Sequence, residues 1–133
     1  MNAATEVGGA VERREFPATL EGLASAAEFV ESFSVSPRAA VVLDEIGSNI
    51  VRCSGAKSFS VELSQAEDRL TIVFKDDGGA FDPTKVSSPD VTASAEDREI
   101  GGLGLFMVRK MSDAVEYARE GDCNVLTVRG IRV

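Results

Sequence analysis

The hydrophobic positions in the first part of this chain predict one strand followed by two helices. Apolar residues recur every three or four positions from Thr19 to Phe33 and again from Arg38 to Arg52, which is the period of an amphipathic helix. Ser36-Pro37 is typical of a helix start, because serine caps free N–H groups and proline fits the first helical turn. Val11 to Phe16 precedes both helices and predicts an edge strand.

The central and C-terminal parts of the chain alternate apolar and polar residues, as half-buried strands do. Phe59 to Leu63 and Leu70 to Phe74 alternate on either side of the polar stretch Ser64 to Arg69, which suits a hairpin turn. Ala114 to Tyr117 and Val125 to Val128 show a similar strand-like pattern around a second turn. We therefore expect two pairs of strands.

A long segment without clear periodicity separates the two pairs. Asp76 to Gly102 is rich in Gly, Pro, Ser, Asp and Glu, and loops of this length are usually functional or mobile. An apolar-periodic helix then begins at Gly101 to Gly104. Because the helices are grouped rather than alternating strictly with strands, the expected fold class is α/β (α+β): a two-layer sandwich of a mixed sheet with helices on one face.

Length and composition favour one ordinary domain. The chain has 133 residues, 44% of them hydrophobic, and we expect residues 1–9 to be disordered and 10–133 to form a single domain. No apolar run approaches the roughly 20 residues that cross a bilayer. The N-terminus also lacks the basic and apolar parts of a secretory signal. The expected location is therefore the cytoplasm, with no membrane partner.

The charge balance and the absence of histidine exclude several classes of function. Fourteen basic residues against 22 acidic ones give a net charge of −8, which repels a phosphate backbone, so no nucleic-acid partner is expected. Without histidine, imidazole-based catalysis, phosphotransfer to histidine and histidine-ligated metal sites are excluded. A general base would have to be a carboxylate, lysine, tyrosine or cysteine.

Two polar residues interrupt the apolar face of the second predicted helix. Glu45 and Asn49 are four positions apart, so they project from the same face. A solvated helix face accounts for them when they are taken alone. The functional interpretation is a carboxylate base beside an amide whose oxygen can ligate Mg²⁺, an ion that needs few protein ligands.

Asp76 and Gly78 follow the strand that ends near Lys75. A turn rich in glycine and proline is the simpler interpretation. A carboxylate at a strand end can instead accept a hydrogen bond from the exocyclic amine of a flat ring, which the missing side chain of glycine allows to approach. Such a pair describes an adenine pocket.

The glycines at 101, 102 and 104 stand at the predicted start of a helix. Free backbone N–H groups and the helix dipole favour an anion there. The cluster is not a P-loop, because no Gly-Lys-Ser/Thr follows, and the dinucleotide fingerprint lacks its preceding strand. Two common nucleotide sites are thereby excluded.

Taken together and in this order, the three clusters resemble the GHKL ATPase superfamily, and within it the anti-sigma serine-protein kinases of bacterial partner switching. Leu43 to Asn49 is similar to the N box, Asp76 to Pro83 to the first glycine box, and Gly101 to Arg109 to the second. The resemblance extends from about Phe16 to Val128, which is nearly the whole chain.

The resemblance implies a role for each cluster. Glu45 would act as the base, Asn49 would hold Mg²⁺, Asp76 would read adenine, Thr127 would back the ring, and the loop from Pro83 to Ile100 would be a lid over the phosphates. The nucleotide-binding residues implied in this way are Asn49, Asp76, Gly78, Gly101, Gly102, Leu103, Gly104 and Thr127.

The function implied is that of a serine/threonine protein kinase that transfers the γ-phosphoryl group of Mg·ATP to a small antagonist protein. A sigma factor and a second copy of the chain are further partners that the resemblance leaves open. The alternative is a regulatory module that holds ATP or ADP and works by protein contact without turnover. The chain also departs from the family at Cys53-Ser54, where His-Ala is common, and at Ala80, where glycine or proline is common.

Overall fold

The computed structural model describes residues 11–85 and 102–133. The N-terminal segment 1–9 and residues 86–100 of the expected lid lie outside the described residues. In the described part, the elements follow the order that the sequence predicts, with the helix of the second glycine cluster between the two pairs of strands. No described helix has the length and apolar character to span a membrane.

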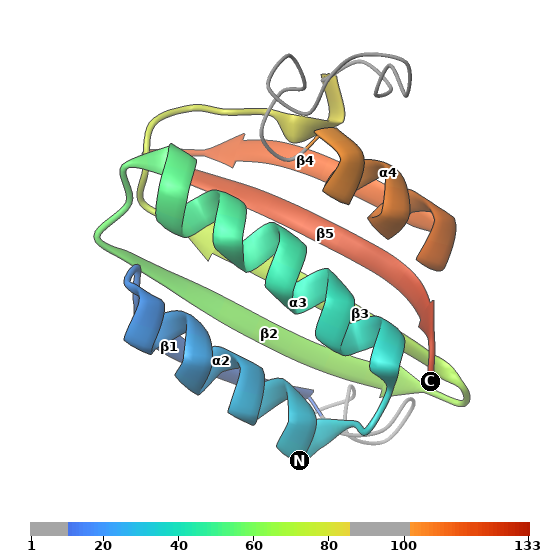
Figure 1. The fold of residues 1–133 in the computed structure, drawn as a ribbon. Helices are drawn as coiled ribbons and strands as arrows, with labels where there is room; N and C mark the ends of the chain where they lie inside the picture. The colour runs from blue at the N-terminus through green and yellow to red at the C-terminus, as the bar shows by residue number, and fades with distance from the viewer. Residues whose placement is uncertain (1–10, 86–101) are drawn as a thin grey trace.

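The described strands form one sheet in the order β1-β2-β3-β5-β4, and every neighbouring pair is antiparallel. This corrects the expectation of a mixed sheet. The strand β4 does run parallel to β3, but β5 folds back between them and pairs antiparallel with both (Figure 1). The strands are β1 (Val11–Pro17), β2 (Ser58–Ala66), β3 (Arg69–Asp76), β4 (Ala114–Glu120) and β5 (Cys123–Arg132).

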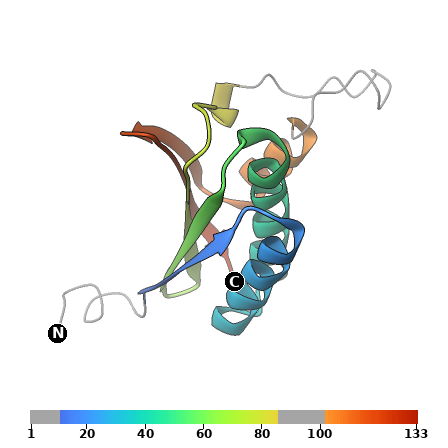
Figure 2. The ribbon, with the colours of Figure 1, turned by 90° about the vertical axis from the view of Figure 1, so that its left-hand side faces the viewer.

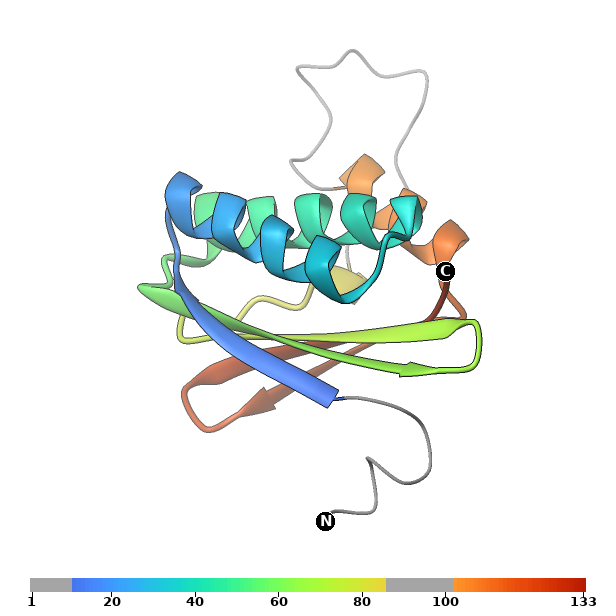
Figure 3. The same ribbon diagram turned by 90° about the horizontal axis from the view of Figure 1, so that it is seen from below.

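Among the described residues, three α-helices cover one face of the sheet and none covers the other, which confirms the two-layer architecture (Figures 2 and 3). They are α2 (Leu20–Phe33), α3 (Pro37–Asn49) and α4 (Gly102–Met111). The first two are capped as serine and threonine caps should be, because Thr19 Oγ1 accepts the N–H of Gly22 and Ser36 Oγ accepts that of Ala39. The caps fix the residue at which each of these helices begins.

The hydrophobic core lies between the two layers. The strands β2, β3 and β5 bury alternate side chains in it, because successive side chains of a strand point to opposite faces of the sheet. The helix α3 contributes the side chains of one face. The side chains that are fully buried include Phe59, Val61, Leu63, Leu70, Ile72, Phe74, Val42 and Leu43. Burial of this set holds α3 across the middle of the sheet.

The end of α3 differs from the prediction that the helix continues to Arg52. The α-helix ends at Asn49, and a π-helical turn, η1 (Ile50–Ser54), continues the chain. The hydroxyl of Ser54 donates to the carbonyl oxygen of Ile50 at 2.7 Å, and Gly55 follows with a φ of 71°. Glycine suits that left-handed position because it has no Cβ. The turn directs the chain back to the sheet at β2.

Candidate functional site

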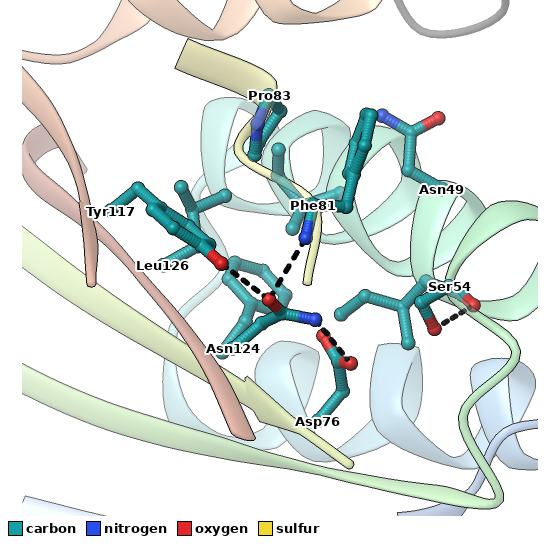
Figure 4. Close-up of a pocket in the computed structure, with 11 residues that line it drawn as sticks. Asn49, Ser54, Asp76, Phe81, Pro83, Tyr117, Asn124 and Leu126 are labelled. Carbon is teal, nitrogen blue, oxygen red and sulfur yellow. Dashed lines mark hydrogen bonds between the residues drawn. The ribbon is translucent and has the colours of Figure 1, made fainter. Parts of the chain in front are cut away.

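A cavity lies between the C-terminal part of α3 and the sheet, next to the end of β3 (Figure 4). Ile46 and Ile50 line it from the helical side, and Phe74 and Leu126 line it from the sheet. Phe81 and Pro83, in the segment after β3, and several polar side chains complete the lining. The polar residues are Asn49, Ser54, Asp76, Tyr117 and Asn124.

Asp76 is the buried acid of this cavity, with 6% of its surface exposed. Its Oδ1 accepts the backbone N–H of Gly78 at 2.9 Å and the Nδ2 group of Asn124 at 3.0 Å. Within the described residues, its Oδ2 has no hydrogen-bond partner. Asp76 thus offers one carboxylate oxygen that only accepts hydrogen bonds, in a cavity with apolar walls.

Asn124 is the functional residue that sequence reasoning missed. It faces Asp76 directly in the register of β3 and β5, and it is 5% exposed. Besides its bond to Asp76, Nδ2 donates to the carbonyl oxygen of Gly79 at 2.8 Å, and Oδ1 accepts the N–H of Phe81 at 3.1 Å (Figure 4). One amide therefore joins the acid to the turn that follows it.

Thr127 does not line the cavity. On β5, the buried residues Asn124, Leu126 and Val128 face the helices, and Thr127 lies between the last two on the opposite face of the sheet. Its register partners are Val73 on one side and Glu116 on the other. The β5 residue paired with Asp76 is Asn124, and the role of Thr127 behind an adenine ring stays a prediction.

Gly78 allows the turn after β3 to lie against η1. A Cβ atom at this position would be 2.4 Å from the carbonyl oxygen of Ser54, closer than atoms can approach. The backbone N–H of Gly79 donates to that same oxygen at 2.9 Å. Glycine at 78 is therefore required by a close backbone approach to Ser54. Gly78 does not line the cavity, and its role in admitting a flat ring stays a prediction.

Asn49 lines the same cavity from the last turn of α3. Its Oδ1 is buried, and it is the one buried side-chain oxygen or nitrogen of the described residues that lacks a hydrogen-bond partner. An unpartnered amide oxygen of this kind suits a hard cation such as Mg²⁺, which takes oxygen ligands and needs few of them from the protein. In keeping with that, the described residues contain no cluster of three acidic, cysteine or histidine side chains that could hold a metal alone.

Glu45 lies one helical turn before Asn49 on α3 and is partly exposed. It does not line the cavity, and the described residues provide it with neither a hydrogen bond nor an ion pair. The spacing of four residues keeps both side chains on the same face of the helix. Glu45 thus lies on the face of α3 that carries Asn49, and its carboxylate forms no ion pair with another described residue.

The second glycine cluster begins α4 as predicted. Gly101 lies outside the described residues, and Gly102, Leu103 and Gly104 form the first turn of the helix, whose N–H groups can receive an anion. Further along α4, Arg109 donates to the carbonyl oxygen of Thr84 at 2.7 Å. That bond connects α4 to the short 3₁₀ turn η2 (Pro83–Lys85), which follows the first glycine cluster.

The two departures from the family pattern have different structural contexts. Ser54 is integrated into the site wall, where its hydroxyl also accepts the N–H of Ala56 at 3.1 Å. Cys53 and Ala80 are exposed, and neither lines the cavity. Ser54 contacts the segment that carries Asp76 and Gly78, and Ala80 belongs to that segment.

Known proteins resemble the chain over most of its length. Residues 16–129 match the family described as the histidine kinase-like ATPase domain. The serine/threonine-protein kinase BtrW of Bordetella bronchiseptica is 29% identical over 96 residues, which cover 72% of this chain and 68% of that protein. The serine-protein kinase RsbW of Listeria monocytogenes is 32% identical over 118 residues, covering 82% and 74%. RsbW of Listeria innocua is 31% identical over 118 residues.

Proposed function

Because this chain belongs to the histidine kinase-like ATPase family, we propose that it is a serine/threonine protein kinase that binds Mg·ATP in the cavity beside α3. Its proposed substrate is a small antagonist protein of a partner-switching pathway in the bacterial cytoplasm. The relatives BtrW and RsbW, which are named as serine/threonine- and serine-protein kinases, support this class of reaction. A sigma factor and a second copy of the chain are the further partners we propose from the resemblance.

The hydrogen bonding of Asp76 and its place in the cavity are the observation that supports the proposal. Its Oδ1 is held by two donors, its Oδ2 has no donor among the described residues, and Asp76 lines the cavity together with Phe74 and Leu126. A flat ring between apolar walls, with an amine directed at that oxygen, satisfies both features of the cavity. Adenine is such a ring, whereas a base with a carbonyl oxygen at the same position would face another acceptor.

The phosphates would extend from the adenine cavity toward Asn49 and the first turn of α4. Asn49 Oδ1 is the ligand we propose for Mg²⁺, which when bound neutralises charge on the phosphates. The backbone N–H groups from Gly102 to Gly104 would bind phosphate oxygens, since the start of a helix favours negative charge. These residues orient the triphosphate; the transfer itself requires little covalent chemistry from the protein.

Glu45 is the residue proposed to move a proton. The hydroxyl oxygen of a serine or threonine of the partner bonds to the γ-phosphorus while the bond from that phosphorus to the β–γ bridging oxygen breaks. The hydroxyl proton passes to the carboxylate of Glu45, and ADP is the leaving group. A carboxylate without a structural partner is available for this role, because protonating it breaks no contact within the described residues.

A second function is favoured by one observation. Glu45 does not line the cavity, so the described residues form an adenine site more completely than they form a transfer site. A regulatory module that binds ATP or ADP and acts through protein contact needs only the adenine site. The two functions differ in whether phosphate leaves the nucleotide.

Incubation with γ-labelled ATP, Mg²⁺ and proteins from neighbouring operons tests the proposal. A kinase yields a labelled serine or threonine on one of those proteins, in an amount that grows with time. A binding module yields none, while still binding ATP in a parallel titration. A chain that neither binds ATP nor labels a protein would contradict both functions.

A further inference from the structure

The side chain of Asn124 is held from β4 as well as by the residues around Asp76. Its Oδ1 accepts the hydroxyl of Tyr117 at 2.5 Å and the Nη1 group of Arg119 at 3.2 Å. The same Nη1 donates to the carbonyl oxygen of Gly78 at 2.9 Å. Two side chains of one strand thus reach across the hairpin to the amide that faces Asp76 (Figure 4 shows Tyr117 and Asn124).

The chemistry of these partners fixes which way the Asn124 amide points. An arginine group and the backbone N–H of Phe81 can only donate, so the atom that they contact must be the amide oxygen. The carbonyl of Gly79 can only accept, so the atom that it contacts must be the amide nitrogen. The nitrogen, and not the oxygen, is therefore directed at Asp76.

We propose that Tyr117 and Arg119 are positioning residues that determine the base specificity of the nucleotide site. They hold Asn124 with its oxygen toward β4, and its nitrogen then occupies Oδ1 of Asp76 and leaves Oδ2 for an exocyclic amine. The inference rests on the proposed function, because it concerns how the same cavity recognises adenine. Arg119 does not line the cavity, and Tyr117, which does, is proposed to act through the bond from its hydroxyl to Asn124.

Loss of either contact changes the acid through Asn124. Asn124 is 5% exposed, so its oxygen cannot exchange a lost donor for water at no cost. If the amide rotated, its oxygen would face the carboxylate of Asp76, and two acceptors would oppose each other. The carboxylate would then move away from the amide, and the cavity would distinguish an amine from its absence less well.

The test compares ATP with purine riboside triphosphate, which lacks only the exocyclic amine, by calorimetric titration in the presence of Mg²⁺. The measured quantity is the Kd of purine riboside triphosphate divided by the Kd of ATP. Tyr117→Phe and Arg119→Ala should each reduce this ratio about five-fold, the effect of one hydrogen bond. Arg129→Ala is the matched control, because Arg129 lies on β5, pairs with Glu116 on β4 at the surface and carries the same charge. It should leave the ratio unchanged.

If Tyr117 and Arg119 had only a general structural role, their substitution would weaken the binding of both nucleotides by the same factor and leave the ratio unchanged. An unchanged ratio in Tyr117→Phe and Arg119→Ala would therefore overturn the inference. If Arg119→Ala fails to fold, Tyr117→Phe decides the question, since it removes one hydroxyl and keeps the ring. In an Asp76→Asn background, where the amine has lost its acceptor, neither substitution should change the ratio further. A parent protein that binds neither nucleotide would contradict the proposed function itself, a different result from an unaltered ratio.

Discussion

The backbone N–H of Gly79 donates to the carbonyl oxygen of Ser54 at 2.9 Å, which joins the end of η1 to the turn behind Asp76. The two segments are far apart in the chain, and their contact closes one wall of the cavity. Because the backbones approach so closely, position 78 has no space for a side chain. The segment that carries Asp76 is thus supported from the helical layer as well as from the sheet.

Gly78→Ala should lower the free energy of unfolding by about 1–3 kcal/mol, the usual effect of forcing an extra carbon into a packed region. Its Cβ would meet three atoms of Ser54 at 2.4 to 2.8 Å. Gly79→Ala is the matched control, since its Cβ would come no closer than 3.9 Å to that residue. Urea denaturation of both variants measures the difference. Equal stability of the two would show that η1 and the turn separate without penalty.

Asp76→Asn should weaken ATP binding by about 1.5–3 kcal/mol, because the amide replaces a charge-assisted hydrogen bond to the amine with a weaker one. The control is Asp77→Asn at the next position, where the carboxylate does not line the cavity. Calorimetric titration with Mg·ATP should find a loss in the first variant only. An affinity equal to that of the parent in Asp76→Asn would remove adenine recognition from this residue.

Asp77 should contribute to stability in a pH-dependent way. The backbone N–H groups of Ser58 and Lys57 donate to its carboxylate and lower the pKa of Asp77 below its ordinary value of 3.8. The folded state therefore gains stability from the ionised form above pH 3.8, and the gain disappears as the pH falls through the lower pKa of the folded protein. Asp77→Asn should be less stable than the parent at pH 7, and the gap should narrow in acid. A gap that is constant with pH would contradict this.

Asn49→Ala should separate stability from function. Removing a buried acceptor that has no partner should raise the free energy of unfolding by at most about 1 kcal/mol. The part of the ATP affinity that EDTA abolishes in the parent should be absent in the variant, because Mg²⁺ has lost its protein ligand. Titrations with and without EDTA measure this. If EDTA weakens binding equally in both proteins, the ion is held elsewhere.

The sequence was sufficient to predict the elements of the fold and less of their pairing. The period of apolar residues reflects which face of each element is buried, and this pattern is local in the sequence, so α2, the two hairpins and α3 up to Asn49 agree with the prediction. Whether β5 would lie between β3 and β4 depends on contacts between distant segments. The mixed sheet was therefore a wrong prediction, made from element order alone.

In the site, too, local patterns could be predicted from the sequence and contacts between distant segments could not. Asp76 and Asn49 belong to local clusters, and the fold brings both to one cavity. Asn124 is a single amide in an alternating strand, and only the register of β3 and β5 sets it opposite Asp76. Thr127 has the same strand context in the sequence but the opposite face in the fold. Tyr117 and Arg119 act through Asn124, so no motif of their own could indicate them.

If this chain transfers phosphate from ATP to a protein with Glu45 as the base, Glu45→Gln should slow that transfer. The substitution keeps the shape of the side chain and removes its ability to accept a proton. With γ-labelled ATP, Mg²⁺ and the partner that the parent labels, the initial rate should fall by about 10²–10⁴-fold, while the affinity for ATP stays near that of the parent. A variant that labels the partner at the parental rate would contradict the role of Glu45, and a parent that binds ATP but labels no protein would contradict the kinase.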